Sequence, residues 1–121
     1  MLRVAINGYG RIGRSLLRAV YESSATEAIK IVAINELSDS STIAHLTRYD
    51  STHGRFPGSV RSDGLKLYIN EDEIQLFAEI LVERLPWEQL EIDAVLECSG
   101  TFSDRNTAEG HLSSGAKKVL F

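Results

Sequence analysis

The first third of the chain alternates regularly between apolar runs and polar or glycine-rich interruptions. Residues 2–6 form a short apolar run, and a Gly-x-Gly-x-x-Gly motif follows at residues 8–13. From within this motif onward, apolar residues recur at the spacing that places them on one face of a helix. They are Ile12, Leu16, Leu17, Val20 and Tyr21. The pattern predicts a strand, a tight turn and a helix that ends near residues 22–24.

Similar patterns predict the rest of the architecture. Buried strands are expected at residues 29–34, 92–97 and 116–121, and short strands at 59–61, 65–69 and 74–77. Helices are expected at 43–49, behind capping residues 39–42, and at 105–114. Residues 79–83 read as extended and 84–90 as a turn into a short helix. Because strand–helix–strand units form parallel pairs, we expect an α/β domain: a doubly wound parallel sheet of the Rossmann type with a small antiparallel insertion.

The glycines of the motif have distinct physical roles in such a turn. Gly8 permits the sharp turn, Gly10 has no side chain to keep a pyrophosphate away from the backbone, and Gly13 lets the helix approach the strand. The N–H groups of Arg11 and Ile12 then face the place where an anion would lie, at the positive end of the helix dipole. Glycines also occur at these positions for packing alone, so a purely structural turn is the alternative.

An acidic residue, Glu36, follows the second predicted strand. In a dinucleotide-binding domain the acid at this point accepts hydrogen bonds from the adenosine ribose hydroxyls. Glu36 lies farther from the glycines than the usual spacing of about 20 residues, because the connection at 23–28 is longer. A solvated acid at a strand end is the alternative interpretation. If Glu36 faces the ribose, a 2′-phosphate there meets a like charge, so NAD is preferred over NADP.

The composition narrows the classes of protein. The 121 residues are 43% hydrophobic and 25% charged with a net charge of −4, which is ordinary for one soluble globular domain. The mild acidity provides no basic patch for nucleic acid, and no apolar run approaches the roughly 20 residues that span a membrane. No secretory leader precedes the first strand, and a single cysteine cannot form an internal disulfide. We therefore expect a cytoplasmic protein without a nucleic-acid or membrane partner.

The reactive side chains indicate neither a catalytic nor a metal site. Cys98 follows a buried strand and is expected to be an inert, mostly buried thiol. The histidines lack the spacing of metal ligands. His45 and His111 are interpreted as helix-surface residues, and His53 as a residue that stabilises a loop. Trp87 is expected to pack in the core rather than to form a binding platform.

Five stretches spread over the chain resemble the N-terminal domain of the glyceraldehyde-3-phosphate dehydrogenase family and occur in the same order. They lie at residues 5–14, 49–56, 85–87, 97–102 and 115–119. Within the family, residues 33–37 and 43–46 look more like the branch that oxidises erythrose 4-phosphate. One reason is that Glu36 stands where glyceraldehyde-3-phosphate dehydrogenases usually carry aspartate. The resemblance implies an NAD-dependent aldehyde dehydrogenase that acts on a sugar-phosphate aldehyde.

The resemblance also implies which residues contact the phosphates and the ribose of the cofactor. The backbone of Arg11 and Ile12 would bind the NAD pyrophosphate, with Asn7 close to it. Glu36 would hold the adenosine ribose. These implied roles agree with the roles that the glycine turn and the strand-end acid have on physical grounds.

Four further residues are implied to lie along the rest of the cofactor. Arg84 would lie beside the adenine through its backbone, and Phe102 would flank the adenine. Ser99 and Gly100 would line the cleft at the end of their strand. The family more often carries threonine at the position of Ser99, which keeps a hydroxyl at the same place.

The resemblance places the catalytic residues elsewhere. In the family a cysteine thiolate attacks the aldehyde and a histidine activates it, and both would follow residue 121. Residues 1–121 are therefore expected to be the NAD-binding domain of a longer, homotetrameric enzyme and to be inactive alone. Two alternatives remain: the phosphorylating glyceraldehyde-3-phosphate dehydrogenase of glycolysis, and a nucleotide-binding module that carries out no reaction.

Overall fold

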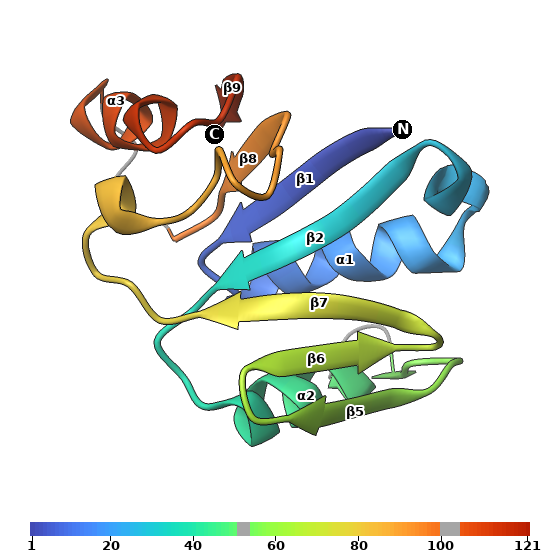
Figure 1. Ribbon diagram of the computed structural model, residues 1–121. Helices are drawn as coiled ribbons and strands as arrows, with labels where there is room; N and C mark the ends of the chain where they lie inside the picture. Colours follow the sequence, from blue (N-terminus) through green and yellow to red (C-terminus); the bar gives the residue numbers. More distant parts are fainter. Residues whose placement is uncertain (51–53, 100–104) are drawn as a thin grey trace.

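The computed structural model describes residues 1–50, 54–99 and 105–121, and in these ranges the main feature is a seven-stranded sheet (Figure 1). Its strand order is β5-β6-β7-β2-β1-β8-β9. The parallel strands are β7 (Asp72–Phe77), β2 (Ile29–Asn35), β1 (Leu2–Asn7), β8 (Ala94–Glu97) and β9 (Lys118–Leu120). The antiparallel strands at one edge are β5 (Val60–Asp63) and β6 (Lys66–Ile69).

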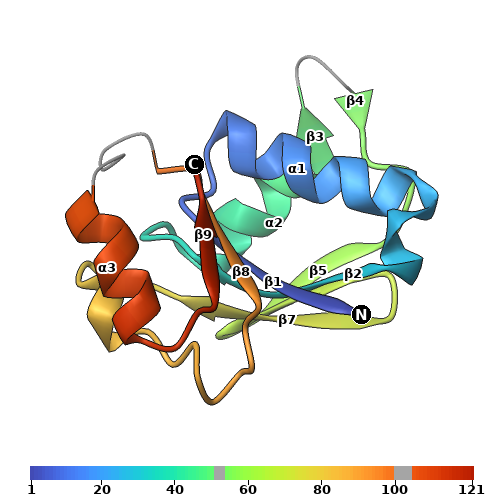
Figure 2. The same ribbon diagram turned by 90° about the horizontal axis from the view of Figure 1, so that it is seen from above.

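Helices cover both faces of this sheet (Figure 2). On one face lie α1 (Arg11–Glu22) and α2 (Ser40–Arg48), and on the other lie α3 (Arg105–Ser113) and the 3₁₀ turn η2 (Val82–Arg84). The remaining elements are the 3₁₀ turn η1 (Ser24–Glu27) and the short antiparallel pair β3 (Tyr49–Asp50) and β4 (Gly54–Arg55). None of the helices in the described ranges combines the length and apolar character needed to cross a membrane. The predicted doubly wound sheet with its antiparallel insertion is confirmed.

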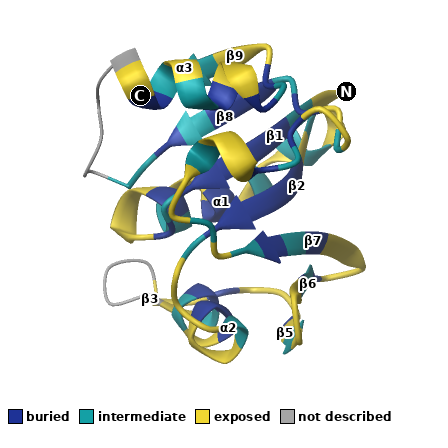
Figure 3. Ribbon diagram, turned by 60° about the vertical axis from the view of Figure 1, so that its left-hand side comes forward, coloured by how far each residue is buried: buried dark blue, intermediate teal, exposed yellow. Residues whose placement is uncertain are grey.

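Each face of the sheet buries its own apolar cluster, because successive side chains of a strand point to opposite faces. Figure 3 shows the buried residues concentrated on the central strands β1 and β2. The larger cluster, with Ile6, Leu17 and Ile43, lies beneath α1 and α2. The smaller one, with Ala5 and Trp87, lies on the face that carries α3. The burial of Trp87 confirms that it packs in the core.

A bulge in β2 changes the alternation of its side chains. β1 and β2 pair regularly up to Ile31, and the register then shifts by one residue so that the next residue of β1 pairs with Ala33. Val32 is therefore an extra residue in β2. Val32 and Ala33 accordingly belong to the same cluster on the α3 face. Beyond the bulge the ladder ends with Asn7 beside Asn35.

The buried part of α1 is shorter than its apolar face. Leu17 is fully buried, and Val20 and Tyr21 pack against the same cluster. Ile12 and Leu16 are exposed, because they face a second cavity beside β8 and the end of β9 instead of the larger cluster. The apolar face of the helix therefore packs against the larger cluster only in its second half.

The connection between β7 and β8 contains less regular structure than the sequence predicts. Its only helical part among the described residues is η2, and residues 86–90 form a hydrogen-bonded turn in which the N–H of Leu90 donates to the carbonyl of Pro86 at 3.1 Å. Glu91 follows with a φ of 55°, in the left-handed region, which stops the chain from continuing as a helix. Leu85 from this connection is buried in the smaller cluster.

Candidate functional site

A cavity of about 330 Å³ opens at the carboxyl ends of the central parallel strands. Its walls come from the ends of β1, β2 and β8 and from the segment that follows β7. The lining residues are Asn7, Gly8, Tyr9, Gly10, Asn35, Glu36, Leu37, Glu79, Ile80, Val82, Cys98 and Ser99. In open parallel sheets, ligands bind in the crevice outside the carboxyl ends of the strands. The cavity therefore lies where a cofactor is expected in this class of fold.

The turn between β1 and α1 requires its glycines for different reasons. Gly8 has a φ of 91°, and a Cβ on it would overlap the backbone of Ser99. A Cβ on Gly13 would lie 2.6 Å from the carbonyl oxygen of Gly8, so the helix and the turn are in direct contact. A Cβ on Gly10 would meet no protein atom within 4 Å. Packing thus explains Gly8 and Gly13, whereas the open space beside Gly10 fits a ligand that approaches the backbone.

The N-terminus of α1 carries no capping side chain. Gly10 is the N-cap residue without a side-chain cap hydrogen bond, and the first turn contains no acidic residue. In α2, by contrast, the carboxylate of Asp39 accepts a hydrogen bond from the N–H of Thr42 at 2.8 Å. The first N–H groups of a helix have no intrahelical partner and favour a negative charge. The first turn of α1 can therefore hold an external anion such as a phosphate.

Glu36, the residue after β2, joins that strand to the glycine turn. Its Oε1 accepts a hydrogen bond from the N–H of Tyr9 at 2.9 Å, and its Oε2 accepts from the N–H and the Oγ of Ser38 at 3.1 and 3.0 Å. Partial burial alone would raise the pKa of Glu36, but these hydrogen bonds outweigh burial and hold the pKa below its usual range. The carboxylate is thus charged at neutral pH and faces the cavity as an acceptor.

Tyr9 anchors the glycine turn to α2. Its ring is buried, and its hydroxyl lies 2.7 Å from Oγ1 of Thr47. The Thr47 hydroxyl donates to the carbonyl of Ile43 at 2.8 Å, so the hydroxyl of Tyr9 is the donor in the bond to Thr47. Burial raises the pKa of Tyr9 to about 12, although the bond to Thr47 and two nearby arginines lower it in part. The turn is therefore held by a neutral phenol as well as by Glu36.

A chain of buried polar side chains lies at the base of the cavity. The backbone N–H of Glu79 donates to Oδ1 of Asn35 at 2.8 Å. Nδ2 of Asn35 donates to Oδ1 of Asn7 at 2.7 Å, and Nδ2 of Asn7 donates to Oε2 of Glu97 at 2.8 Å. These residues come from the ends of three adjacent strands and from the segment after β7, so the chain links the walls of the cavity.

His111 of α3 continues this chain, and its interpretation as a helix-surface residue was wrong. Its side chain is fully buried, with Nε2 at 2.7 Å from Oε2 of Glu97 and Nδ1 at 3.0 Å from Nε1 of Trp87. A buried imidazole is tolerated here because both ring nitrogens have partners. His45 is exposed on α2 as predicted, and His53 lies outside the described residues.

Glu97 accepts hydrogen bonds on both carboxylate oxygens. Besides Asn7 and His111 on Oε2, the Oγ and the N–H of Ser99 lie 2.5 and 3.2 Å from Oε1. Burial by itself would raise the pKa of Glu97, but the bonds from His111, Ser99 and Asn7 outweigh it and lower the pKa. Burial, with the charge of Glu97, raises the pKa of the neighbouring Cys98 thiol, which is therefore protonated at neutral pH. Among the described residues, no group of three His, Cys, Asp or Glu side chains could hold a metal ion.

The cavity, the uncapped helix and the strand-end acid together have the geometry of a dinucleotide site. Residues 2–105, most of the chain, match the family model described as the NAD binding domain of glyceraldehyde 3-phosphate dehydrogenase. The chain belongs to the glyceraldehyde-3-phosphate dehydrogenase family. As a domain of this family it has NAD as its cofactor, and the family implies an NAD-dependent oxidoreductase.

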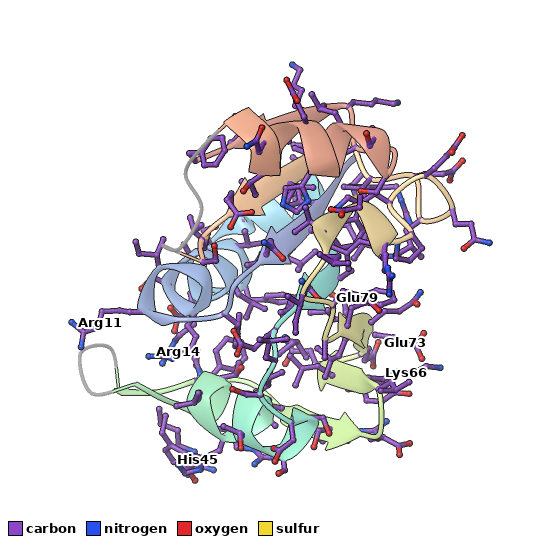
Figure 4. All side chains as sticks on the ribbon, turned by 90° about the vertical axis from the view of Figure 1, so that its left-hand side faces the viewer. Arg11, Arg14, His45, Lys66, Glu73 and Glu79 are labelled. Carbon is purple, nitrogen blue, oxygen red and sulfur yellow. The ribbon has the colours of Figure 1, made fainter. Side chains whose placement is uncertain are left out.

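The cavity brings together five of the residues that the sequence assigns to the cofactor of this family. They are Asn7, Gly8, Gly10, Glu36 and Ser99. Arg11, Ile12 and Gly13 form the first turn of α1, beside Gly10. The exposed side chain of Arg11 projects away from the body of the domain (Figure 4), so the predicted contact of Arg11 rests on its backbone N–H alone.

Three predicted residues are not placed at the cavity. Arg84 is exposed in η2 and does not line the cavity, where the same segment contributes Ile80 and Val82 instead. Gly100 and Phe102 lie outside the described residues. The roles of all three therefore stay predictions.

Sequence reasoning missed part of the site. Asn35, Tyr9 and Glu79 line the cavity, and Glu97 and His111 lie behind it. One signal was available, because the dipeptide Ile-Asn ends both of the first two strands. Polar residues at the ends of neighbouring parallel strands meet at one edge of the sheet, where ligands bind.

Proposed function

We propose that the domain holds NAD in the cavity with the pyrophosphate at the first turn of α1 and the adenosine ribose at Glu36. The observation that supports this proposal is the uncapped N-terminus of α1 beside Gly10, where no protein atom fills the space of a Cβ. N–H donors and room for an anion coincide there. Asn7 and Ser99 would lie along the cofactor, and the backbone of Arg84 and the ring of Phe102 beside the adenine.

The charge of Glu36 favours NAD over NADP in this arrangement. Its carboxylate already accepts hydrogen bonds from the N–H and hydroxyl donors of Tyr9 and Ser38. Ribose hydroxyls are donors of the same kind. A 2′-phosphate would replace a donor by a second negative charge, which Glu36 disfavours.

Calorimetric titration with NAD and with NADP tests this assignment. We expect NAD to bind at least about tenfold more tightly than NADP, and Glu36→Ala to reduce the difference. Glu71→Ala is the matched control, because Glu71 is an exposed acid just before β7, at the opposite end of the parallel strands from the cavity. Equal affinities of the unmodified protein for both dinucleotides would contradict the role of Glu36.

For the reaction, we infer that the complete enzyme oxidises erythrose 4-phosphate to 4-phosphoerythronate, as D-erythrose-4-phosphate dehydrogenases do in pyridoxal-phosphate synthesis. The support is the resemblance of residues 33–37 and 43–46 to that branch, with Glu36 in place of aspartate. NAD, when bound, accepts the hydride. The nucleophilic cysteine and its histidine would follow residue 121, water would release the acyl enzyme, and the enzyme would be a cytoplasmic homotetramer.

Turnover of the full-length polypeptide tests this inference. NADH formation is measured with erythrose 4-phosphate and, separately, with glyceraldehyde 3-phosphate plus inorganic phosphate. A higher kcat/KM for erythrose 4-phosphate supports the inference. Preference for glyceraldehyde 3-phosphate would assign the chain to the glycolytic enzyme. NAD binding without turnover of either aldehyde would indicate a nucleotide-binding module instead.

A further inference from the structure

The polar chain at the base of the cavity has a fixed hydrogen-bond direction. At one end stands the backbone N–H of Glu79, which can only donate. It requires Oδ1 of Asn35 as its acceptor, so Nδ2 of Asn35 faces Asn7. Asn7 must then present Oδ1 to Asn35 and Nδ2 to Glu97. The orientation of both amides is thereby determined.

At the other end stands the indole N–H of Trp87, which also can only donate. Its acceptor is Nδ1 of His111, so the proton of the neutral imidazole is on Nε2 and points to Glu97. Glu97 is therefore the acceptor for the hydrogen bonds that run from Glu79 through Asn35 and Asn7 and for those that run from Trp87 through His111. Among the described residues, its donors are Nε2 of His111, Nδ2 of Asn7, and the N–H and Oγ of Ser99.

We propose that Glu97 and His111 are positioning residues for the cofactor, because they hold the amide of Asn7 and the hydroxyl of Ser99 in one orientation at the cavity wall. This inference rests on the proposed site for NAD. One N–H of the Asn7 side-chain amide donates to Glu97. Because the amide is planar, this bond also fixes the direction of the second N–H. The hydroxyl proton of Ser99 is likewise committed, so toward other groups its oxygen acts as an acceptor.

A carboxylate is needed at position 97, since an amide of the same shape cannot replace it. In Glu97→Gln one oxygen becomes an NH₂ group, which would face either Ser99 or the pair of donors from Asn7 and His111. His111 cannot turn into an acceptor at Nε2 while Trp87 donates to Nδ1. Asn7 cannot turn its oxygen toward Gln without losing the bond from Asn35. With the NH₂ toward Asn7 and His111, buried donors face each other. With the NH₂ toward Ser99, it faces the Ser99 N–H, and the Ser99 hydroxyl has to turn and become an acceptor. Either arrangement changes the orientation of Asn7 or Ser99.

Titrations of the full chain with NAD and with adenosine test the proposal. Adenosine carries the ribose that Glu36 would bind but lacks the pyrophosphate near Asn7. Its affinity therefore shows whether the rest of the site is folded, independently of Asn7. We expect Glu97→Gln and His111→Phe to weaken NAD binding about tenfold and to leave adenosine binding unchanged. His111→Gln, whose amide keeps a donor near the position of Nε2, should restore most of the NAD affinity.

His45→Gln is the matched control for His111→Gln. His45 is an exposed histidine on α2, well separated from Glu79 in Figure 4, and its replacement should leave both affinities unchanged. If Glu97→Gln fails to fold, the comparison of His111→Phe with His111→Gln decides. Wild-type NAD affinity in His111→Phe, or equal losses of NAD and adenosine binding, overturns the positioning role.

Asn7→Ala separates this inference from the proposed cofactor site. Weaker NAD binding in Asn7→Ala, together with unchanged NAD binding in Glu97→Gln and His111→Phe, overturns only the positioning role. Unchanged NAD binding in Asn7→Ala overturns the proposed contact at Asn7 and with it the reason for positioning that residue. Parallel losses in Asn7→Ala, Glu97→Gln and His111→Phe, with adenosine binding intact, support both.

Discussion

The backbone of Gly8 lies against the backbone of Ser99, so closely that a single added methyl group at residue 8 would overlap it. This contact joins the ends of β1 and β8 at the mouth of the cavity, and it coincides with a φ of 91° at Gly8. Gly10, two residues further on, adjoins open space. The two glycines therefore predict opposite behaviour on substitution.

Gly8→Ala should destabilise the fold by more than about 2 kcal/mol, because it combines backbone overlap with a left-handed backbone. Gly10→Ala should cost about 1 kcal/mol or less, the usual loss for alanine at an N-cap, and should weaken NAD binding. Urea denaturation and calorimetric titration of the two variants measure both quantities. Full NAD affinity in a stably folded Gly10→Ala would show that the open space is not used by the cofactor.

The ring of His111 is expected to carry its proton on Nε2 and none on Nδ1. The reason is the bond from the indole N–H of Trp87 to Nδ1, which a protonated Nδ1 could not accept. Nitrogen-15 NMR of the imidazole rings distinguishes the tautomers, and His45 provides an exposed ring for comparison. A protonated Nδ1 on His111 would disprove the hydrogen-bond direction described here.

The chain should lose stability in acid partly through Glu97. The pKa of Glu97 is lower in the folded state than in the unfolded chain. Above the pKa that Glu97 has in the unfolded chain, its charged carboxylate therefore stabilises the fold. That contribution is lost as the pH falls through the lowered pKa, when the carboxylate takes up a proton. Urea midpoints measured from pH 6 to pH 3 should therefore fall more steeply for the unmodified chain than for Glu97→Gln. Equal slopes would mean that Glu97 does not contribute to the loss of stability in acid.

Replacement of the buried Arg18 in α1 should be costly. Its Nη1 donates to the carbonyl of Gly54 at 2.7 Å, its Nη2 lies 3.2 Å from Glu22, and its guanidinium stands over the ring of Phe56. Arg18→Met should lower the free energy of unfolding by about 2–3 kcal/mol, since it keeps the apolar stem and removes the donors. Arg11→Met is the control at an exposed arginine of the same helix. Chemical denaturation that gives equal values for both variants would exclude a structural role for the Arg18 guanidinium.

Those parts of the fold that depend on local sequence could be predicted. The apolar run that forms β1 and the capping carboxylate of Asp39 act within a few residues, and both are found where the sequence places them. Glu36 could be located at the end of β2 for the same reason. These features follow from strand periodicity and cap chemistry alone.

The buried polar chain depends on contacts between distant residues and could not be predicted in the same way. α3 carries few apolar residues, so its pattern does not reveal that His111 faces the core. The partners of His111 lie 24 and 14 residues earlier, at Trp87 and Glu97. Ile12 illustrates the opposite case, because its apolar character predicts burial while its position beside β8 leaves it exposed.

The extra residue in β2 determines which amides meet at the cofactor cavity. If Val32 were paired in the ladder instead of bulged, β1 and β2 would keep their initial register, and Ile34 instead of Asn35 would lie beside Asn7. Every side chain of β2 beyond that point would also change faces of the sheet. The bulge therefore acts on the strand as a frameshift acts on a message: one extra residue, Val32, is taken up without a partner, and each later residue is read on the side of the sheet that brings Asn35 to Asn7.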